Sequence, residues 1–113
     1  MHMDSGVCIV MTSIGTEDEA ESLAEAIVEA RLAACVQVHR VRSLYIWQDV
    51  LHREPEWVLH IKTLDARYGA LEAFIRERHS YETPEIVRVP VTAGSADYLD
   101  WLRAGSTPPR AQE

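Results

Sequence analysis

Apolar and polar residues follow two periods along this chain, one typical of strands and one typical of helices. A continuous apolar run over residues 7–11 has the length and composition of a buried strand. Apolar residues then recur every three or four positions between 20 and 28, behind a capping box formed by Thr16 and Glu19. The pattern therefore predicts a central strand followed by an amphipathic helix.

The middle of the chain predicts a long antiparallel hairpin. Residues 35–39 and 43–47 alternate as half-buried strands do, and the change of phase near Arg40 predicts a bend or bulge there. Residues 48–55 are polar and turn-like, and the alternation resumes over 56–62. Along this last strand, odd and even positions occupy opposite faces: Trp57, Leu59 and Ile61 against Val58, His60 and Lys62.

The last third of the chain predicts a helix, a strand and a short helix. Asp65 is expected to cap a helix that ends before Pro84, which places His79 at or just past the helix end. A strand over 85–91 follows, and Pro90 favours an edge position for it. A short helix is expected after Ser95, ending near residue 105.

This order of elements indicates an α+β fold. Strand, helix, strand, strand, helix, strand is the ferredoxin-like βαββαβ sandwich, with both main helices on one face of an antiparallel sheet and a short C-terminal helix added. A chain of 113 residues with 47% hydrophobic content suits one core. We expect a flexible leader over 1–6, a single domain over 7–105 and a mobile tail over 106–113.

Composition narrows the classes of function. With 18 acidic against 11 basic residues and a net charge of -7, the chain lacks a basic stripe for nucleic acid. Its apolar runs are too short to cross a membrane and no signal peptide is evident, so we expect a cytoplasmic protein. Neither cysteine nor histidine spacing matches a disulfide framework or a zinc motif. No motif of a hydrolase or phosphate-binding enzyme is present, and we expect no enzymatic activity.

The segment 78–86 is the strongest candidate for chemistry. It brings an imidazole, a phenol and two carboxylates to the point where a helical pattern gives way to an apolar run. Pro84 stops the helix and favours an extended chain, so these polar groups lie at a structural joint. Joints of this kind hold side chains in fixed directions and can form a binding site.

Five short segments together resemble the CutA divalent-cation-tolerance family. Their order and spacing are specific, although each motif alone is weak: residues 30–36, 43–47, 61–63, 79–86 and 98–102. The resemblance implies a cytoplasmic homotrimer, similar in architecture to the PII signalling proteins, that serves tolerance to copper and other divalent cations. The large apolar side chains of Leu44, Tyr45 and Trp47 also favour burial against another subunit, because a two-stranded hairpin cannot hide them.

The resemblance implies copper ligands that this sequence matches only in part. The family's proposed ligands are a cysteine after the first strand and two adjacent histidines at the end of the second helix. Met11 and Arg78 stand at the first two positions, and only His79 matches. His79 is therefore the candidate metal ligand, aided by carboxylates for Cu(II), while Met11 would suit Cu(I). The alternative is that His79 hydrogen-bonds backbone carbonyls at the helix end.

A second set of residues suggests a ligand pocket. The resemblance places Lys62 near the same inter-subunit cleft as the segment 79–86, where its ammonium could hold a small anionic or zwitterionic ligand. An interface salt bridge is the alternative role for Lys62. Three functions stay open: a cation-tolerance protein, a PII-like sensor of a small ligand, and a non-enzymatic trimeric scaffold. The candidate ligand-binding residues are Trp47, Glu56, Lys62, Tyr81 and Glu82, beside His79.

Overall fold

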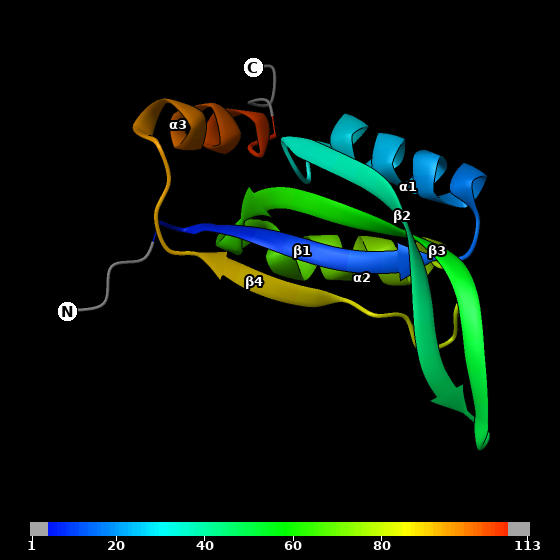
Figure 1. Cartoon of the computed structure of the whole chain (residues 1–113). Helices are drawn as coiled ribbons and strands as arrows, with labels where there is room; N and C mark the ends of the chain where they lie inside the picture. The colour runs from blue at the N-terminus through cyan, green and yellow to red at the C-terminus, as the bar shows by residue number, and fades with distance from the viewer. Residues whose placement is uncertain (1–4, 109–113) are drawn as a thin grey trace.

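The computed structural model describes residues 5–108 as a single four-stranded sheet with three helices (Figure 1). The strands lie in the order β2-β3-β1-β4, and every neighbouring pair is antiparallel. This is the predicted ferredoxin-like arrangement, and it confirms the α+β fold. A 3₁₀ turn precedes α2, and the elements are β1 (Val7–Ile14), α1 (Glu17–Glu29), β2 (Cys35–Trp47), β3 (Val50–Leu64), α2 (Tyr68–Arg78), β4 (Val87–Val91) and α3 (Ala96–Gly105).

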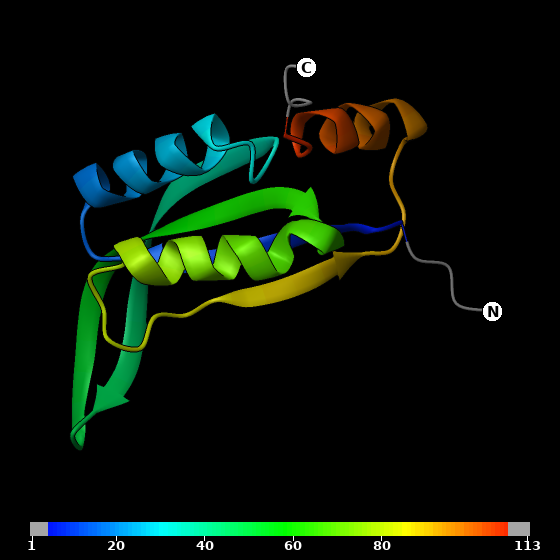
Figure 2. The same ribbon diagram turned by 180° about the vertical axis from the view of Figure 1, so that it is seen from behind.

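The main core lies between the sheet and the two long helices, which cover the same face (Figure 2). Leu59 and Ile61 of β3 point into it and are fully buried, as the alternation predicted. Ile27 of α1 and Ile75 of α2 meet them from the helix layer. Burying aliphatic side chains of this size stabilises the fold by about 1.5–3 kcal/mol each.

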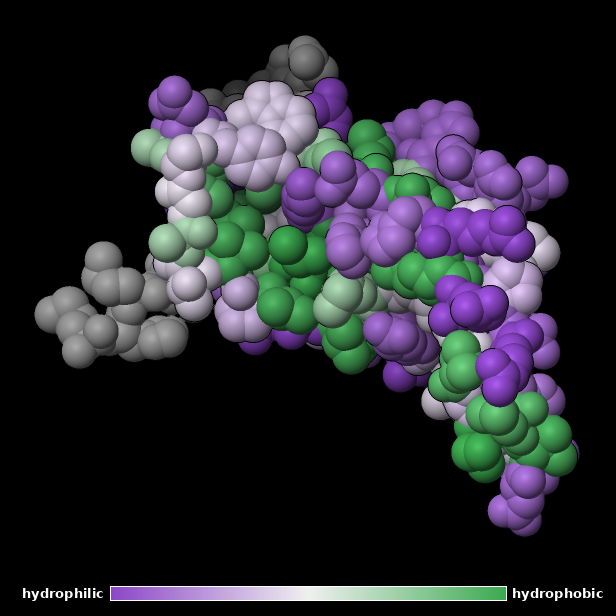
Figure 3. All heavy atoms as spheres, in the orientation of Figure 1, coloured by the Kyte–Doolittle hydropathy of each residue, from purple (hydrophilic) through white to green (hydrophobic). Residues whose placement is uncertain are grey.

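The opposite face of the sheet is covered only at its ends. Val7 packs there with Leu99 and Leu102 of α3, and the segment that follows α2 borders the other end. The middle, here called the open face, shows a group of apolar side chains in Figure 3. Alternation along the paired strands puts eight residues on it: Ile9, Met11, Gln37, His39, Val58, His60, Val87 and Val89.

The hairpin corrects two predictions. β2 and β3 pair without interruption from Cys35 opposite Lys62 to Trp47 opposite Val50, so there is no bulge near Arg40. The turn is not 48–55 but only Gln48 and Asp49, whose φ angles of 51° and 63° fit the type I′ turns of hairpins. Residues 52–55 are polar, and β3 has lost β1 as a neighbour there, so this part of the hairpin is a two-stranded ribbon outside the sheet.

A third correction concerns Asp65. It does not cap α2, whose N-cap residue is Arg67 and has no side-chain capping hydrogen bond. Asp65 begins the 3₁₀ turn, and its carboxylate instead accepts a hydrogen bond of 2.5 Å from Arg88 on the edge strand β4. By contrast, Thr16 caps α1 as predicted, accepting from the backbone N–H of Glu19 at 3.2 Å.

The N-terminal end of the described chain is tied to the sheet, and the other end is packed against the domain at one buried residue. The Ser5 hydroxyl donates to the Val91 carbonyl, and the Gly6 carbonyl accepts from Asp65. Ser106 is fully buried. Residues 1–4 of the predicted leader and 109–113 of the predicted tail lie outside the described residues. Among those that are described, no helix is both long and apolar enough to span a membrane.

Candidate functional site

His79 fixes the segment that follows α2. It is the C-terminal cap of that helix, as predicted, and its side chain reaches back to β1. Nε2 lies 2.8 Å from the carbonyl oxygen of Ser13, and Nδ1 accepts from the backbone N–H of Tyr81 at 3.0 Å. Because a carbonyl can only accept and a backbone N–H can only donate, the ring carries its proton on Nε2. Both ring nitrogens are therefore engaged within the protein.

This arrangement bears directly on the implied copper site. A ligating imidazole must offer a lone pair, and neither nitrogen of His79 has one free here. The guanidinium of Arg78 lies over the ring of Phe74 at 3.6 Å, and Met11 lies on the open face. Across residues 5–108, no three His, Cys, Asp or Glu side chains gather in a metal-binding group. The geometry supports the alternative role of His79 in backbone hydrogen bonding, and copper ligation by His79 stays a prediction.

A cleft of about 460 Å³ lies between the hairpin and the segment after α2. Across it, the Tyr81 hydroxyl donates to the Glu56 carboxylate at 3.0 Å. The cleft contains four of the predicted ligand-binding residues, together with residues that the sequence did not single out. Its lining is Ser13, Tyr45, Trp47, Glu56, Tyr81, Glu82, Thr83 and Glu85.

Lys62 does not join this cleft within one chain. It lies six residues from Glu56 along β3, roughly 20 Å at the rise of a strand. Its ammonium sits over the ring of Tyr98 in α3, 5.6 Å from the centroid. There it borders a second, mostly apolar cavity of about 240 Å³ under α3. A pocket that contains both Lys62 and Glu56 would have to combine different subunits.

The charge of the cleft favours a cationic ligand. Its lining includes the carboxylates of Glu56, Glu82 and Glu85 and three aromatic rings, and it contains no Lys, Arg or His. Aromatic faces and carboxylates both attract cations. Burial, followed by the hydrogen bond to Glu56, raises the pKa of Tyr81 to about 12. The phenol therefore stays protonated and keeps donating to Glu56.

Gly15 is a part of this site that the sequence analysis missed. A Cβ atom at Gly15 would lie 3.1 Å from the hydroxyl oxygen of Tyr81, so the absence of a side chain makes room for the phenol. The Ser80 hydroxyl also ties the segment to α1 by donating to Glu19 at 3.1 Å. Gly15 directly follows Ile14, the last residue of β1, and the sequence pattern gave no other signal of its role.

We expect Glu56→Gln to bring the pKa of Tyr81 down toward its ordinary value. The negative charge of Glu56 favours the neutral phenol, and an amide would not. Since the folded pKa exceeds the unfolded value of about 10, the contribution of Tyr81 to stability is complete below that pH and disappears as pH rises through 12. Ultraviolet absorbance of phenolate, with Tyr81→Phe to identify the signal, measures the shift. Glu54→Gln is the matched control, and an equal shift in it would contradict the assignment.

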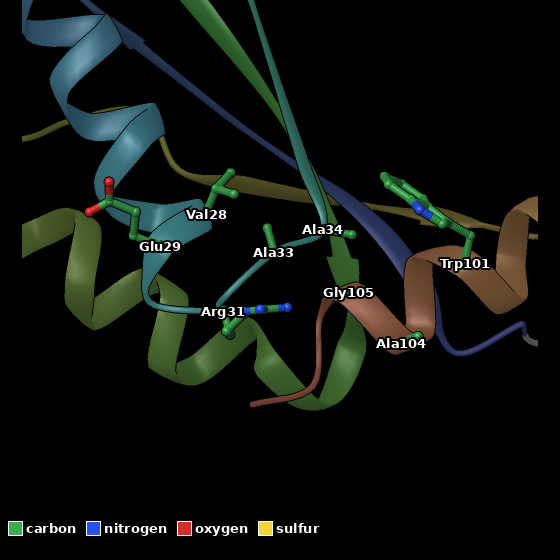
Figure 4. Close-up of a pocket in the computed structure, with 8 residues that line it drawn as sticks. All are labelled: Val28, Glu29, Arg31, Ala33, Ala34, Trp101, Ala104 and Gly105. Atoms are coloured by element: carbon green, nitrogen blue, oxygen red, sulfur yellow. The ribbon is translucent and has the colours of Figure 1, made fainter. Parts of the chain in front are cut away.

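Another cavity, of about 670 Å³, lies between the end of α1 and α3 (Figure 4). Small residues such as Ala33, Ala34 and Ala104 form much of its lining, and Trp101 stands at its α3 side. It contains none of the predicted site residues. The charged side chains in its lining are those of Glu29 and Arg31, and both residues are exposed, so it lacks the buried, convergent polar groups expected of a specific small-molecule site.

Comparison with known proteins gives a consistent result. Residues 8–105 match the family described as CutA1 divalent ion tolerance protein. The divalent-cation tolerance protein CutA of Thermus thermophilus is 38% identical over 96 residues, which cover 84% of this chain and 93% of that protein.

Solved structures agree with this match. The structure of CutA from Synechococcus elongatus has a TM-score of 0.89 at 36% identity, covering 93% of this chain and 94% of that one. The structure described as the periplasmic divalent cation tolerance protein CutA from Archaeoglobus fulgidus has a TM-score of 0.86 at 26% identity, covering 89% and 99%.

Proposed function

The chain belongs to the CutA1 divalent ion tolerance family, and from this premise we propose that it acts as a cytoplasmic homotrimer in tolerance to divalent cations, copper among them. The observation that carries the proposal is the apolar end of the hairpin, here called the hairpin tip. Each residue of the tip is more than half exposed, from 51% for Leu51 to 67% for Ile46. The tip comprises Leu44, Ile46, Trp47, Val50 and Leu51.

The hairpin tip supports assembly with further copies of the chain. It extends beyond the sheet, and Figure 3 shows its apolar side chains gathered near the end of the molecule. A two-stranded ribbon is marginal in water, and a contiguous exposed apolar patch marks an interaction surface. When the hairpin tip of each subunit contacts the next subunit in the same way, the repeated contact forms a closed ring of subunits. The number of subunits, three, comes from the family resemblance.

A substitution in the hairpin tip tests the assembly. We expect light scattering to give the full-length protein three times its chain mass, and Ile46→Asp to give a smaller species, because a charge cannot be buried unpaired in an apolar interface. Val28→Asp on α1, another exposed apolar position at 39%, is the matched control and should keep the larger mass. A wild-type monomer, or an equal effect of both substitutions, would contradict the proposal.

The state of the two cysteines supports the proposed cytoplasmic location. Cys8 and Cys35 are both free, as is usual in reducing compartments. Burial, helped by Asp65, raises the pKa of Cys8 to about 12, so this thiol is unreactive in the folded protein. Cell fractionation separates this location from the periplasm, the compartment named for the Archaeoglobus relative.

The acidic and aromatic cleft favours a second function, a sensor of a small ligand. A cation such as an organic ammonium suits Glu56, Glu82 and Glu85 in one chain, whereas an anionic part of a ligand would need Lys62 from a neighbouring subunit. Uptake of an ammonium ligand that Glu82→Gln weakens would support the sensor. Saturable binding of a protein partner without any small ligand would support the scaffold instead.

A further inference from the structure

The cavity under α3 is a mostly apolar space that lies within one chain. Its walls come from three elements and are mainly aliphatic: Val7 and Ile9 of β1, Val91 of β4, and Leu99 and Leu102 of α3. Three of these, Val7, Leu99 and Leu102, are buried together in a hydrophobic cluster, so packing holds the walls in place. The volume of about 240 Å³ is below the range of about 300–1,000 Å³ usual for ligand pockets, which limits an occupant to a small molecule.

Lys62 supplies the charge of this cavity. Among the described residues that line it, Lys62 alone has a charged side chain. Lys62 is half-buried, and its ammonium lies 5.6 Å from the centroid of the Tyr98 ring, which also lines the cavity. No carboxylate within residues 5–108 forms an ion pair with it, whereas Arg88 and Arg103 both have carboxylate partners. A half-buried cation therefore borders an apolar cavity without a negative partner. Lys62 is also the only lysine in the sequence.

This combination determines the class of ligand. An ammonium without a counter-charge is stabilised by an anion, and a charge-assisted hydrogen bond to a carboxylate is among the strong ones in proteins. The aliphatic walls favour an apolar tail, because burial of each CH₂ group strengthens binding by up to about fourfold. A phosphate group is a poorer match, since it needs several donors and the cavity offers one cationic group. The chemistry of the cavity therefore selects one carboxylate attached to a short aliphatic tail.

We propose that the cavity under α3 binds a small aliphatic monocarboxylate, with the carboxylate on the Lys62 ammonium and the tail between β1 and α3. The acidic cleft lies roughly 20 Å away along β3 and favours a cation, so the two sites take ligands of opposite charge. The site deepens the proposed sensor function by naming a second class of ligand, and it rests on that function only for its role in the cell. It needs no residue from another subunit.

The single lysine gives a direct test. Reductive methylation of the full-length protein with isotope-labelled formaldehyde keeps the charge of Lys62 and adds one lysine signal to a carbon–proton NMR spectrum, which Lys62→Met identifies by its loss. We expect hexanoate to shift this signal saturably. Acetate, which lacks the tail, should bind at least about tenfold more weakly. Hexylammonium, which has the tail with the opposite charge, should leave the signal unchanged.

Calorimetric titration of the unmodified protein with hexanoate measures the contribution of each part of the site. Lys62→Met keeps the apolar stem and removes the charge, and it should weaken binding by about tenfold or more, as loss of a hydrogen bond to a charged group does. Ala93→Leu should weaken binding as well, because Ala93 is an exposed lining residue and a larger side chain there narrows the cavity. Arg76→Gln removes an equal charge from an exposed position of α2, and this matched control should bind as the wild type does.

Other results would overturn the site. Absence of hexanoate binding in the wild type would favour the alternative of an interface salt bridge for Lys62. Equal binding in the wild type, Lys62→Met and Ala93→Leu, or equal binding of hexylammonium, would show that the cavity and its charge do not select the ligand. Glu82→Gln should leave hexanoate binding unchanged, so failure of this site and failure of the acidic cleft are distinguished. Since Ala93 is exposed, Ala93→Leu provides the test even if Lys62→Met fails to fold.

Discussion

Replacing Leu59 with alanine is expected to lower the free energy of unfolding by about 2–5 kcal/mol. Leu59 is fully buried in the middle of β3, which has β2 on one side and β1 on the other. The substitution removes apolar contacts and leaves a cavity under both long helices. The surrounding four strands and two helices fix the walls of this cavity, so the protein has little freedom to collapse around the smaller alanine side chain.

Denaturant unfolding at one fixed protein concentration measures this effect, because assembly makes apparent stability depend on concentration. Val28→Ala removes apolar atoms from an exposed position of α1 and should change the free energy by no more than about 0.5 kcal/mol. A loss below about 1 kcal/mol for Leu59→Ala would place this side chain outside the core and contradict the register of β3.

We expect Gly105→Val to destabilise the protein by about 1–3 kcal/mol, through overpacking. A Cβ atom at Gly105 would lie 2.8 Å from the Cβ and 3.2 Å from the Cα of Ala34. Since these atoms belong to or adjoin the backbone, no rotation of a side chain relieves the clash. The end of α3 must therefore move away from the start of β2, which weakens the packing of Leu102 on Val7.

The fluorescence of Trp101, compared with that of a Trp101→Phe variant, reports this movement, and denaturant unfolding reports the energy. Gly69→Ala is an informative contrast. Nothing lies within 4 Å of a Cβ at Gly69, in the first turn of α2, so alanine there should raise stability by up to about 1 kcal/mol. A change of the same sign in both variants would contradict the packing described at Gly105.

The sequence predicted the helices and strands that bury one face, because one-sided burial makes apolar residues recur at regular intervals along the chain. The capped helix after Thr16 and the alternation around Leu59 are examples, and both were confirmed. The same reasoning failed for residues 50–55, which pair with β2 alone and show no alternation of apolar and polar positions, although residues 43–47 of the same ribbon do. Gln48 and Asp49 also lack the Asn-Gly or Asp-Gly signature that identifies a two-residue turn.

The sequence predicted only part of the site, because it does not show how far apart the residues lie in space. The cleft brings together Trp47, Glu56, Tyr81 and Glu82, but the length of β3 carries Lys62 to the other end of the sheet. The partner of His79 is the carbonyl of Ser13, which is 66 residues away in the sequence. Every residue has such a carbonyl, so no side-chain pattern could have revealed that contact.

The central place of β1 in the sheet has a consequence for synthesis of the chain. β1 is made first, yet its two partners are β3 and β4, and Val7 pairs with Val91 at the far end of the domain. At about 5–20 residues per second, the ribosome needs roughly 4–17 s to cover that separation. Until β4 has been synthesised, the apolar strand β1 has at least one edge without a partner strand. We expect chaperones to bind the nascent chain during this time.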